Sequence, residues 1–341
     1  MTVADRDHAT ARLLLLLAGF VLVWTLYFAI TEAPVAIKHD MAEAYAWGRQ
    51  FELGYNQHPP FWAWVCGAWF RVLPRTLWAF ALLSALNAAI GLWGAWAAIG
   101  DFATGATRRA AFALLLATPL YTVYAYKYDA NTIVLSIWPW TIHGFVLSLR
   151  SRRTRDALGF GIGAGLALMS KYYALVLLFS CFVAALLHPA RRRYFASAAP
   201  YVSVLTALAL LSPHLWWLAT HRAPPLRYLH SITDWPWSWI LRDAWQALGG
   251  IVGMNAAPVA LAAWFAWRGG RAPAAPLAAP PDEPAIRLLA VLTLLPPALT
   301  LAAGLALRTR IKSEMMLGVF PLLPLLAIAL ARPLATERLA R

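Results

Sequence analysis

The chain has 341 residues, of which 61% are hydrophobic and only 13% are charged, and its mean hydropathy is +0.59. Soluble domains carry about 25% charged residues, so this composition excludes an ordinary soluble globule and predicts a multi-span membrane protein. The formal net charge is +14, which would suggest a nucleic-acid partner in a soluble protein. In a membrane protein, the distribution of Lys and Arg instead indicates which side of the membrane each loop faces. We therefore expect no nucleic-acid partner.

The hydrophobic pattern predicts an all-α polytopic protein of about ten transmembrane helices with both termini on one side. The first apolar run is too long for the hydrophobic part of a signal peptide, so we interpret it as an uncleaved signal anchor. The ten runs cover residues 11–30, 77–99, 110–124, 132–149, 157–169, 172–187, 198–218, 244–267, 288–307 and 316–331.

The distribution of basic residues predicts which side faces the cytoplasm. In the ten-span arrangement, 17 of the 29 Lys and Arg residues fall on the side of the termini and 12 on the other side. Short Arg-dense connections mark the cytoplasmic side, so both termini are expected there. The outer side then carries two long loops, 31–76 and 212–243, both rich in aromatic residues that suit the headgroup layer.

Three parts of the chain are expected from these patterns. Residues 1–268 would form a membrane catalytic module with the two outer loops. Residues 269–287 are rich in Ala and Pro and predict a cytoplasmic linker that buries no core. Residues 288–341 would form a C-terminal pair of spans and a tail.

The first outer loop concentrates acidic and aromatic residues. Asp40 stands where a helix N-cap would, with Glu43 three residues later, so a capped helix is expected over residues 41–51. The step His58-Pro59-Pro60 precedes a Trp-rich segment, 61–70, that is too short to span. Both segments are expected to lie in the membrane interface. A capped amphipathic helix with no chemical role explains Asp40 equally well.

Three further outer connections carry cations or amides. Lys127, Asp129 and Asn131 share a very short turn, where they could grip a phosphate and sugar hydroxyls or simply cap the following span. Lys171 stands in a second turn, where its ammonium could bind an anion or snorkel to the interface. Arg308, Arg310 and Lys312 lie between the last two spans, as an anion site or as interfacial anchors.

These residues fall in motifs that resemble a known family. The motifs are Asp40-x-x-Glu-Ala-Tyr-Ala-Trp-Gly48, Gly54-Tyr followed by His58-Pro-Pro-Phe-Trp-Ala-Trp64, Lys127-Tyr-Asp-Ala-Asn131 and Gly165-Leu-Ala-Leu-Met-Ser-Lys-Tyr172. Together they resemble glycosyltransferase family 39, the membrane glycosyltransferases related to protein O-mannosyltransferases and bacterial aminoarabinose transferases. The resemblance covers about the first 220 residues.

The resemblance implies a C-type glycosyltransferase membrane fold in a bacterial-type inner membrane. It implies that Asp40 is catalytic, that Asp129 is the second outer-loop acid and that Lys171 is the turn lysine. Many members have Glu directly after the first Asp, whereas Met41 stands here, so a contribution from Glu43 stays open. The acceptor, whether a lipid, a glycan or a protein, is not identified by the motifs.

The reaction expected from this resemblance is transfer of a sugar from a polyprenyl-phosphate donor to an acceptor hydroxyl at the outer, periplasmic face. Asp40 would act as general base, with inversion at the anomeric carbon. Lys127, Lys171, Arg308, Arg310 and Lys312 would stabilise the departing phosphate, with Asp129, Asn131, Tyr172, Glu43 and His58 as further donor-binding candidates. No cofactor is required, although Asp40, Glu43, His58 and Asp129 could hold a divalent cation.

Two other classes of function stay open on the sequence. A transporter or flippase of lipid-linked sugars would use the same cations without chemistry. The predicted spans hold almost no ionisable residues, which argues against an ion-coupled pump. A non-catalytic member of the family is the third interpretation.

Overall fold

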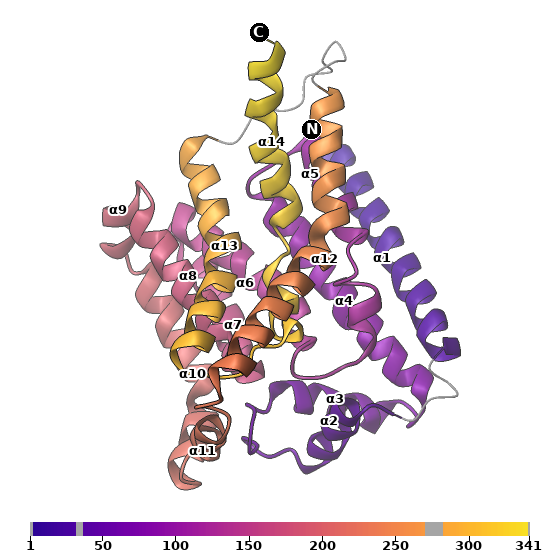
Figure 1. The fold of residues 1–341 in the computed structure, drawn as a ribbon, viewed down its shortest axis with the longest axis vertical. Helices are drawn as coiled ribbons and strands as arrows, with labels where there is room; N and C mark the ends of the chain where they lie inside the picture. Colours follow the sequence, from indigo (N-terminus) through magenta and orange to yellow (C-terminus); the bar gives the residue numbers. More distant parts are fainter. Residues whose placement is uncertain (1–2, 32–36, 270–281, 340–341) are drawn as a thin grey trace.

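The computed structural model describes residues 3–31, 37–269 and 282–339, and within these ranges every regular element is helical. Long helices run lengthwise beside one another, and the N- and C-terminal helices both begin or end toward the same end of the bundle (Figure 1). Short helices lie at the opposite end (Figure 1). The all-α class is therefore confirmed.

Among the residues that the structure describes, five helices are long and apolar enough to cross a membrane. Each coincides closely with one of the predicted runs, because an uninterrupted stretch of roughly 20 apolar residues is both a span signal and a good helix former. They are α1 (Val3–Thr31), α4 (Leu77–Gly100), α6 (Ile133–Ser151), α10 (Ala199–Thr220) and α13 (Glu283–Ala306).

The other predicted runs also contain helices, most of which are shorter. Only α12, which has 33 residues, is longer than a typical span. The helices in these other runs are α5 (Gly105–Leu116), α7 (Thr154–Ser170), α8 (Ala174–Leu187), α12 (Trp237–Gly269) and α14 (Leu323–Leu339). The count of ten spans and the placement of helices in the interface stay predictions.

Two of the predicted runs are broken in the structure. The run 110–124 contains the end of α5 at Leu116 and then a 3-10 segment, η1 (Val123–Tyr126). Pro119 accounts for the break, because the residue before a proline is disfavoured in the α conformation. The run 316–331 likewise begins in a second 3-10 segment, η2 (Ser313–Val319), before α14.

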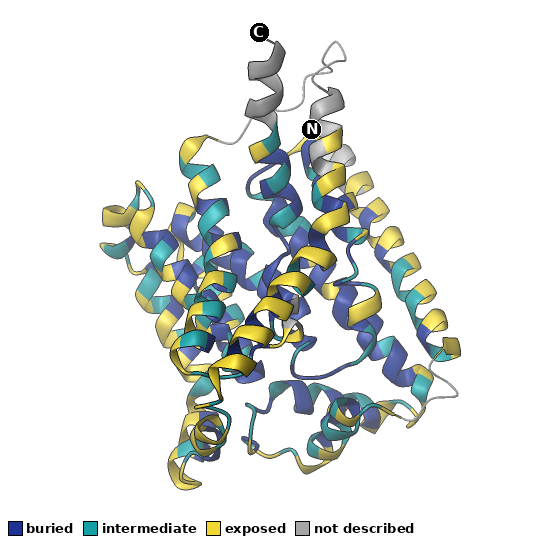
Figure 2. Cartoon of the chain, viewed as in Figure 1, coloured by how far each residue is buried: buried dark blue, intermediate teal, exposed yellow. Residues whose placement is uncertain are grey.

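Burial separates a central helix from peripheral ones. Leu15 and Leu22 on α1 are 73% and 61% exposed, which is the exterior expected where lipid is the solvent. The large side chains Trp138 and Phe145 on α6 are almost fully buried. Figure 2 shows the same contrast between the exposed outer helices and the dark interior. The helices pack in a continuous series: α1 contacts α4, α4 contacts α6, α6 contacts α7, and α7 contacts α10.

The end of the bundle opposite the termini carries the remaining short helices. These are α2 (His39–Gln50), α3 (Phe61–Val72) and α11 (Pro224–Ser231), whereas α9 (Arg191–Phe195) lies apart from them (Figure 1). α2 and α3 pack directly on each other. Gly48 and Gly67 make this possible, because a Cβ on either would strike the backbone of the other helix.

The expected division of the chain into three parts stays a prediction. Most of the linker expected at 269–287 lies outside the described residues, which resume at Asp282. Asp282 caps α13 by accepting a hydrogen bond from the backbone N–H of Ala285 at 3.0 Å.

Candidate active site

Lys127 forms ion pairs with three carboxylates, two of which come from distant segments of the chain. Its Nζ lies 3.0 Å from Oδ2 of Asp40, 3.4 Å from Oδ2 of Asp129 and 3.5 Å from Oε2 of Glu314. Burial disfavours the Lys127 charge, but Asp129, the hydrogen bond to Asp40 and Glu314 outweigh it and raise the pKa of Lys127. Lys127 is therefore a permanent cation that ties α2 and η2 to the turn before α6. We call these four residues the Lys127 cluster.

Asp40 presents its carboxylate to water in the first turn of α2. The helix begins at His39, and its N-cap, Lys38, makes no side-chain capping bond, so the expected N-cap role of Asp40 is wrong. The carboxylate turns instead toward Lys127, and 40% of the side chain stays exposed. Burial opposes ionisation, but the hydrogen bond and charge of Lys127, with a smaller effect of His39, lower the pKa of Asp40.

Asp129 is the buried member of the Lys127 cluster. Its side chain is 1% exposed, so it cannot meet a substrate in the aqueous phase. Its Oδ1 accepts the backbone N–H groups of Asn131 at 2.7 Å and Thr132 at 2.8 Å, just before α6 begins. The carboxylate therefore closes the turn before α6 and also positions Lys127, but α6 has no side-chain cap, so the cap expected from Asp129 is not formed.

Lys171 lies between α7 and α8 and has a neutral partner. Its Nζ donates to Oδ1 of Asn131, and the residue is 8% exposed. Burial lowers the pKa of Lys171 to about 8, against the opposing effects of Asp129 and Glu314. No carboxylate among the described residues is in ion-pair contact with Lys171. Its charge is thus less compensated than that of Lys127 and is better suited to an incoming anion.

A buried histidine fixes the hydroxyl of Tyr172. His214 on α10 places Nδ1 2.8 Å from the carbonyl of Leu53 and Nε2 2.7 Å from the Tyr172 oxygen. A carbonyl only accepts, so Nδ1 carries the proton and Nε2 accepts from the tyrosine O–H. His214 is fully buried. It therefore joins the first outer loop to the turn that carries Lys171.

Glu43 and His58 lie near the Lys127 cluster, and neither forms a hydrogen bond with it in the described part of the chain. Burial, helped by Asp40 and Asp129 and opposed by His39, raises the pKa of Glu43. Burial and the Lys171 cation lower the pKa of His58 to about 4, so this imidazole is neutral near pH 7. Among the described residues, no group of three or more His, Cys, Asp or Glu side chains could hold a metal ion. The set of metal ligands suggested by the sequence is not assembled.

The two arginines between the last helices have partners away from the Lys127 cluster. Arg308 donates to the carbonyl of Trp235 at 3.0 and 3.2 Å. Arg310 binds Asp243 at 2.5 Å and lies over the rings of Trp235 and Trp239. These contacts fasten the second outer loop. Lys312 is exposed and has no ion pair among the residues described.

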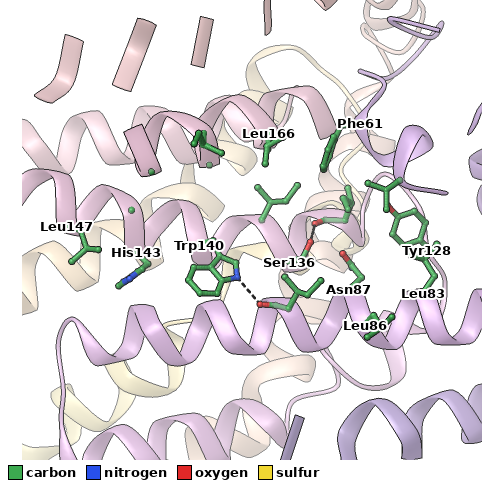
Figure 3. Close-up of a pocket in the computed structure, with 18 of the residues that line it drawn as sticks. Phe61, Leu83, Leu86, Asn87, Tyr128, Ser136, Trp140, His143, Leu147 and Leu166 are labelled. Atoms are coloured by element: carbon green, nitrogen blue, oxygen red, sulfur yellow. Dashed lines mark hydrogen bonds between the residues drawn. The ribbon is translucent and has the colours of Figure 1, made fainter. Parts of the chain in front are cut away.

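An apolar cavity of about 580 Å³ extends from this end of the bundle along α4, α6 and α7. Figure 3 shows Phe61 and Tyr128 at one end of the row of lining residues and His143 and Leu147 at the other. Phe61 and Tyr128 belong to the segments that also carry His58 and Lys127. Trp140 closes part of the wall by donating to the carbonyl of Ile90 at 3.0 Å.

Two residues of this site were not expected from the sequence. Glu314 is on η2, far along the chain from Asp40, and its neighbours Ser313 and Met315 form no recognisable motif. His214 lies within an apolar run, where a lone histidine gives no sign of its partner. The one feature of the sequence that could have pointed to Glu314 is its position four residues after Arg310, on the expected outer side.

Residues 57–217 match the family model described as dolichyl-phosphate-mannose-protein mannosyltransferase. The resemblance indicated by the motifs is therefore confirmed over this stretch, which is a little under half of the chain. The matched range contains His58, Lys127, Asp129, Lys171 and His214. Asp40 and Glu314 lie outside it.

Individual relatives support the same class. Lipid A galacturonosyltransferase RgtD of Rhizobium johnstonii is 28% identical over 239 residues, which are 65% of this chain and 46% of that protein. The chain thus spans about half the length of this curated relative. The crystal structure of ArnT from Cupriavidus metallidurans bound to undecaprenyl phosphate superposes with a TM-score of 0.67 at 18% identity, covering 95% of this chain and 61% of that one. ArnT in the apo state gives 0.65 at 16% identity, covering 97% and 60%. The chain has an ArnT-like fold.

Proposed function

We propose that this protein transfers a sugar from a polyprenyl-phosphate donor to an acceptor hydroxyl at the outer, periplasmic face of a bacterial inner membrane. The observation that carries the proposal is the Asp40–Lys127 pair at one end of an apolar cavity, with a buried ammonium, Lys171, nearby. The family domain and the undecaprenyl phosphate bound to the ArnT relative support the donor class.

Asp40 is the residue best suited to act as general base. Its carboxylate is ionised, because Lys127 lowers its pKa, and it is accessible, because 40% of the side chain is exposed. Asp129 has the opposite properties and acts as a positioning residue. Asp40 accepts the proton of the acceptor hydroxyl as that oxygen attacks the anomeric carbon, a contribution of roughly 10²–10⁴-fold.

The leaving group determines the role of the lysines. As the new C–O bond forms, the bond from the anomeric carbon to the phosphate oxygen breaks, and polyprenyl phosphate leaves with the electron pair. Attack opposite the leaving group inverts the anomeric centre. Lys171 stabilises the charge that develops on the phosphate, and this favours the transition state over the ground state. Lys127 orients Asp40 and adds to the positive potential.

The cavity matches the remaining part of the donor. A polyprenyl chain is apolar, and the walls formed by α4, α6 and α7 are dominated by Leu, Ile and aromatic side chains. With the chain in the cavity, the phosphate lies toward Phe61 and Tyr128, the end next to the Lys127 cluster. The acceptor then approaches Asp40 from the aqueous side.

The test is donor turnover by the purified protein in lipid nanodiscs. Undecaprenyl-phosphate sugars labelled in the sugar are supplied with candidate acceptor lipids, and released undecaprenyl phosphate is measured. We expect Asp40→Asn to lose at least 10²-fold in rate, and Glu52→Gln, an exposed acid of the same loop, to match wild type. Equal rates for wild type and Asp40→Asn would refute the catalytic role. Transbilayer movement of donor without release would favour a flippase.

A further inference from the structure

A second, polar pocket lies between α2 and α3 and is lined by three arginines. It has a volume of about 140 Å³, and its lining residues are Tyr45, Arg49, Gly67, Phe70, Arg71 and Arg75. Arg49 is in the last turn of α2, Arg71 is in the last turn of α3, and Arg75 stands in the loop before α4. Three cations therefore converge on one small concavity, which we call the arginine pocket.

The three guanidinium groups have no anionic partner within the described part of the chain. None of them forms an ion pair or a hydrogen bond with another described residue. Arg71 lies 4.0 Å from the centre of the Phe51 ring, and Arg75 lies 6.0 Å from that of Tyr45. An aromatic face holds a guanidinium in place without using its N–H groups, so the five donors of each arginine stay free for a ligand.

The backbone under the pocket is built for close approach. Gly48 and Gly67 bring α2 and α3 into backbone contact, and a Cβ on Gly67 would strike both Gly48 and the ring of Phe51. Tyr45 packs edge-on against Phe70 at 5.5 Å. The floor is therefore rigid, and like charges are gathered above it although their mutual repulsion is unfavourable. An anionic ligand would relieve that repulsion.

The arginine pocket is separate from the proposed active site. Asp40 and Arg49 are nine residues apart on α2, which is about 14 Å along the axis and half a turn around it. The first faces Lys127, and the second faces the arginine pocket. A ligand of the pocket would thus lie on the far side of α2 from the reacting sugar.

The position of the pocket identifies the class of ligand. Arg75 stands two residues before α4, one of the helices able to cross a membrane, and Trp78 near the start of α4 is 43% exposed. Val72, next to Arg71, is 85% exposed. Exposed apolar and Trp side chains beside cations at the end of a span are typical of the headgroup level, where phosphates are the abundant anions.

We propose that the arginine pocket binds a phosphate group, either that of an anionic membrane lipid or a soluble phosphate, at a site distinct from that of the sugar donor. The ligand oxygens would accept charge-assisted hydrogen bonds from Arg49, Arg71 and Arg75.

Native mass spectrometry of the detergent-solubilised protein with phosphatidylglycerol tests this proposal. Relative to wild type, Arg71→Gln/Arg75→Gln is expected to raise the apparent Kd of the first bound phosphatidylglycerol at least fivefold. Arg222→Gln/Arg227→Gln removes the same charge from exposed sites at the same end of the bundle and is expected to change it less than twofold. Equal effects of the two double variants would overturn the proposal, because net charge alone would then explain binding.

A second measurement separates the two sources of phosphate. Inorganic phosphate is titrated against the protein loaded with phosphatidylglycerol, with phosphatidylcholine as the neutral control lipid. Release of phosphatidylglycerol from wild type at millimolar phosphate, and no such competition in Arg71→Gln/Arg75→Gln, would identify soluble phosphate as a sufficient ligand. Retention of the lipid would identify the headgroup as the ligand. Equal binding of phosphatidylcholine and phosphatidylglycerol to wild type would reject the site.

Discussion

The Nζ of Lys127 lies 3.0 Å from Oδ2 of Asp40, although the two residues are 87 positions apart in the chain. Through this contact the residue that initiates the proposed reaction depends on a turn belonging to another part of the bundle. The pair keeps Asp40 ionised while leaving it open to water.

Removal of the Lys127 ammonium is expected to destabilise the fold. Lys127→Met leaves Asp129 buried with an unpaired charge, and breaking such a pair costs about 3 kcal/mol. Thermal unfolding in detergent should therefore show a clearly lower Tm for Lys127→Met, whereas Lys312→Met, an exposed lysine, should unfold like wild type. Adding Asp129→Asn to Lys127→Met removes the unpaired charge and should recover part of the loss. A Tm for Lys127→Met equal to that of wild type would show that the cluster contributes little to stability.

Donor binding is expected to depend on pH through Lys171. Because burial lowers its pKa to about 8, the ammonium is present at pH 7 and is lost as the pH rises through 8. If only the charged form binds phosphate, the apparent Kd for donor rises up to about tenfold between pH 7 and pH 9. Lys171→Arg stays charged over this range and should give a flat profile. A flat profile for wild type would exclude Lys171 as the phosphate ligand.

The hydrogen bonds of His214 are expected to be coupled to Tyr172. His214→Phe removes the acceptor of the tyrosine proton and leaves the Leu53 carbonyl unpaired, at a cost of roughly 1–3 kcal/mol. Tyr172→Phe should cost less, and the double variant should cost less than the sum of the two single ones. Chemical denaturation of the three variants measures the coupling. Strict additivity would mean that the two side chains do not act together.

A bulkier side chain in the long cavity is expected to raise the KM for donors with a long lipid more than the KM for donors with a short one. Ile162 lines the cavity from α7, and Ile162→Trp adds bulk there. The KM for an undecaprenyl donor should rise about tenfold, whereas a donor with a two-isoprene lipid should be little affected. Leu175→Trp, on the exposed surface of α8, is the matched control. An equal response to both donor lengths would mean that the chain lies elsewhere.

Much of the fold could be predicted from hydropathy, because long apolar runs such as those of α1 and α4 are read directly from composition. The breaks in the helices at Pro119 and after η2 were harder to predict, because apolar residues continue through both positions. Asp40, Lys127, Asp129 and Lys171 could be named from motifs, but their mutual contacts could not. The N-cap expected at Asp40 was wrong, because α2 already begins at His39 and the Asp40 carboxylate binds Lys127 instead.

Residues without a local pattern were the ones missed. Glu314 pairs with Lys127, and His214 joins Tyr172 and Leu53, which are 42 and 161 positions away along the chain. No spacing rule connects such positions. Arg310 shows the converse case. It was expected to bind an anion, and the anion it contacts is Asp243 of its own chain. The sequence indicates that such a cation binds an anionic group. Which group it binds depends on the fold.

The two carboxylate oxygens of Asp129 contact different structures. Oδ1 holds the turn that leads into α6, and Oδ2 faces Lys127. α6 also forms a wall of the long cavity through Ser136, Trp140 and His143. A rotation of α6 when a lipid chain enters or leaves would therefore shift Asp129, then Lys127 and then Asp40. If the cavity holds the donor lipid as proposed, its loaded and empty states would differ in the orientation of the Asp40 carboxylate. The buried Asp129 side chain would then link occupancy of the cavity to the geometry of the proposed base.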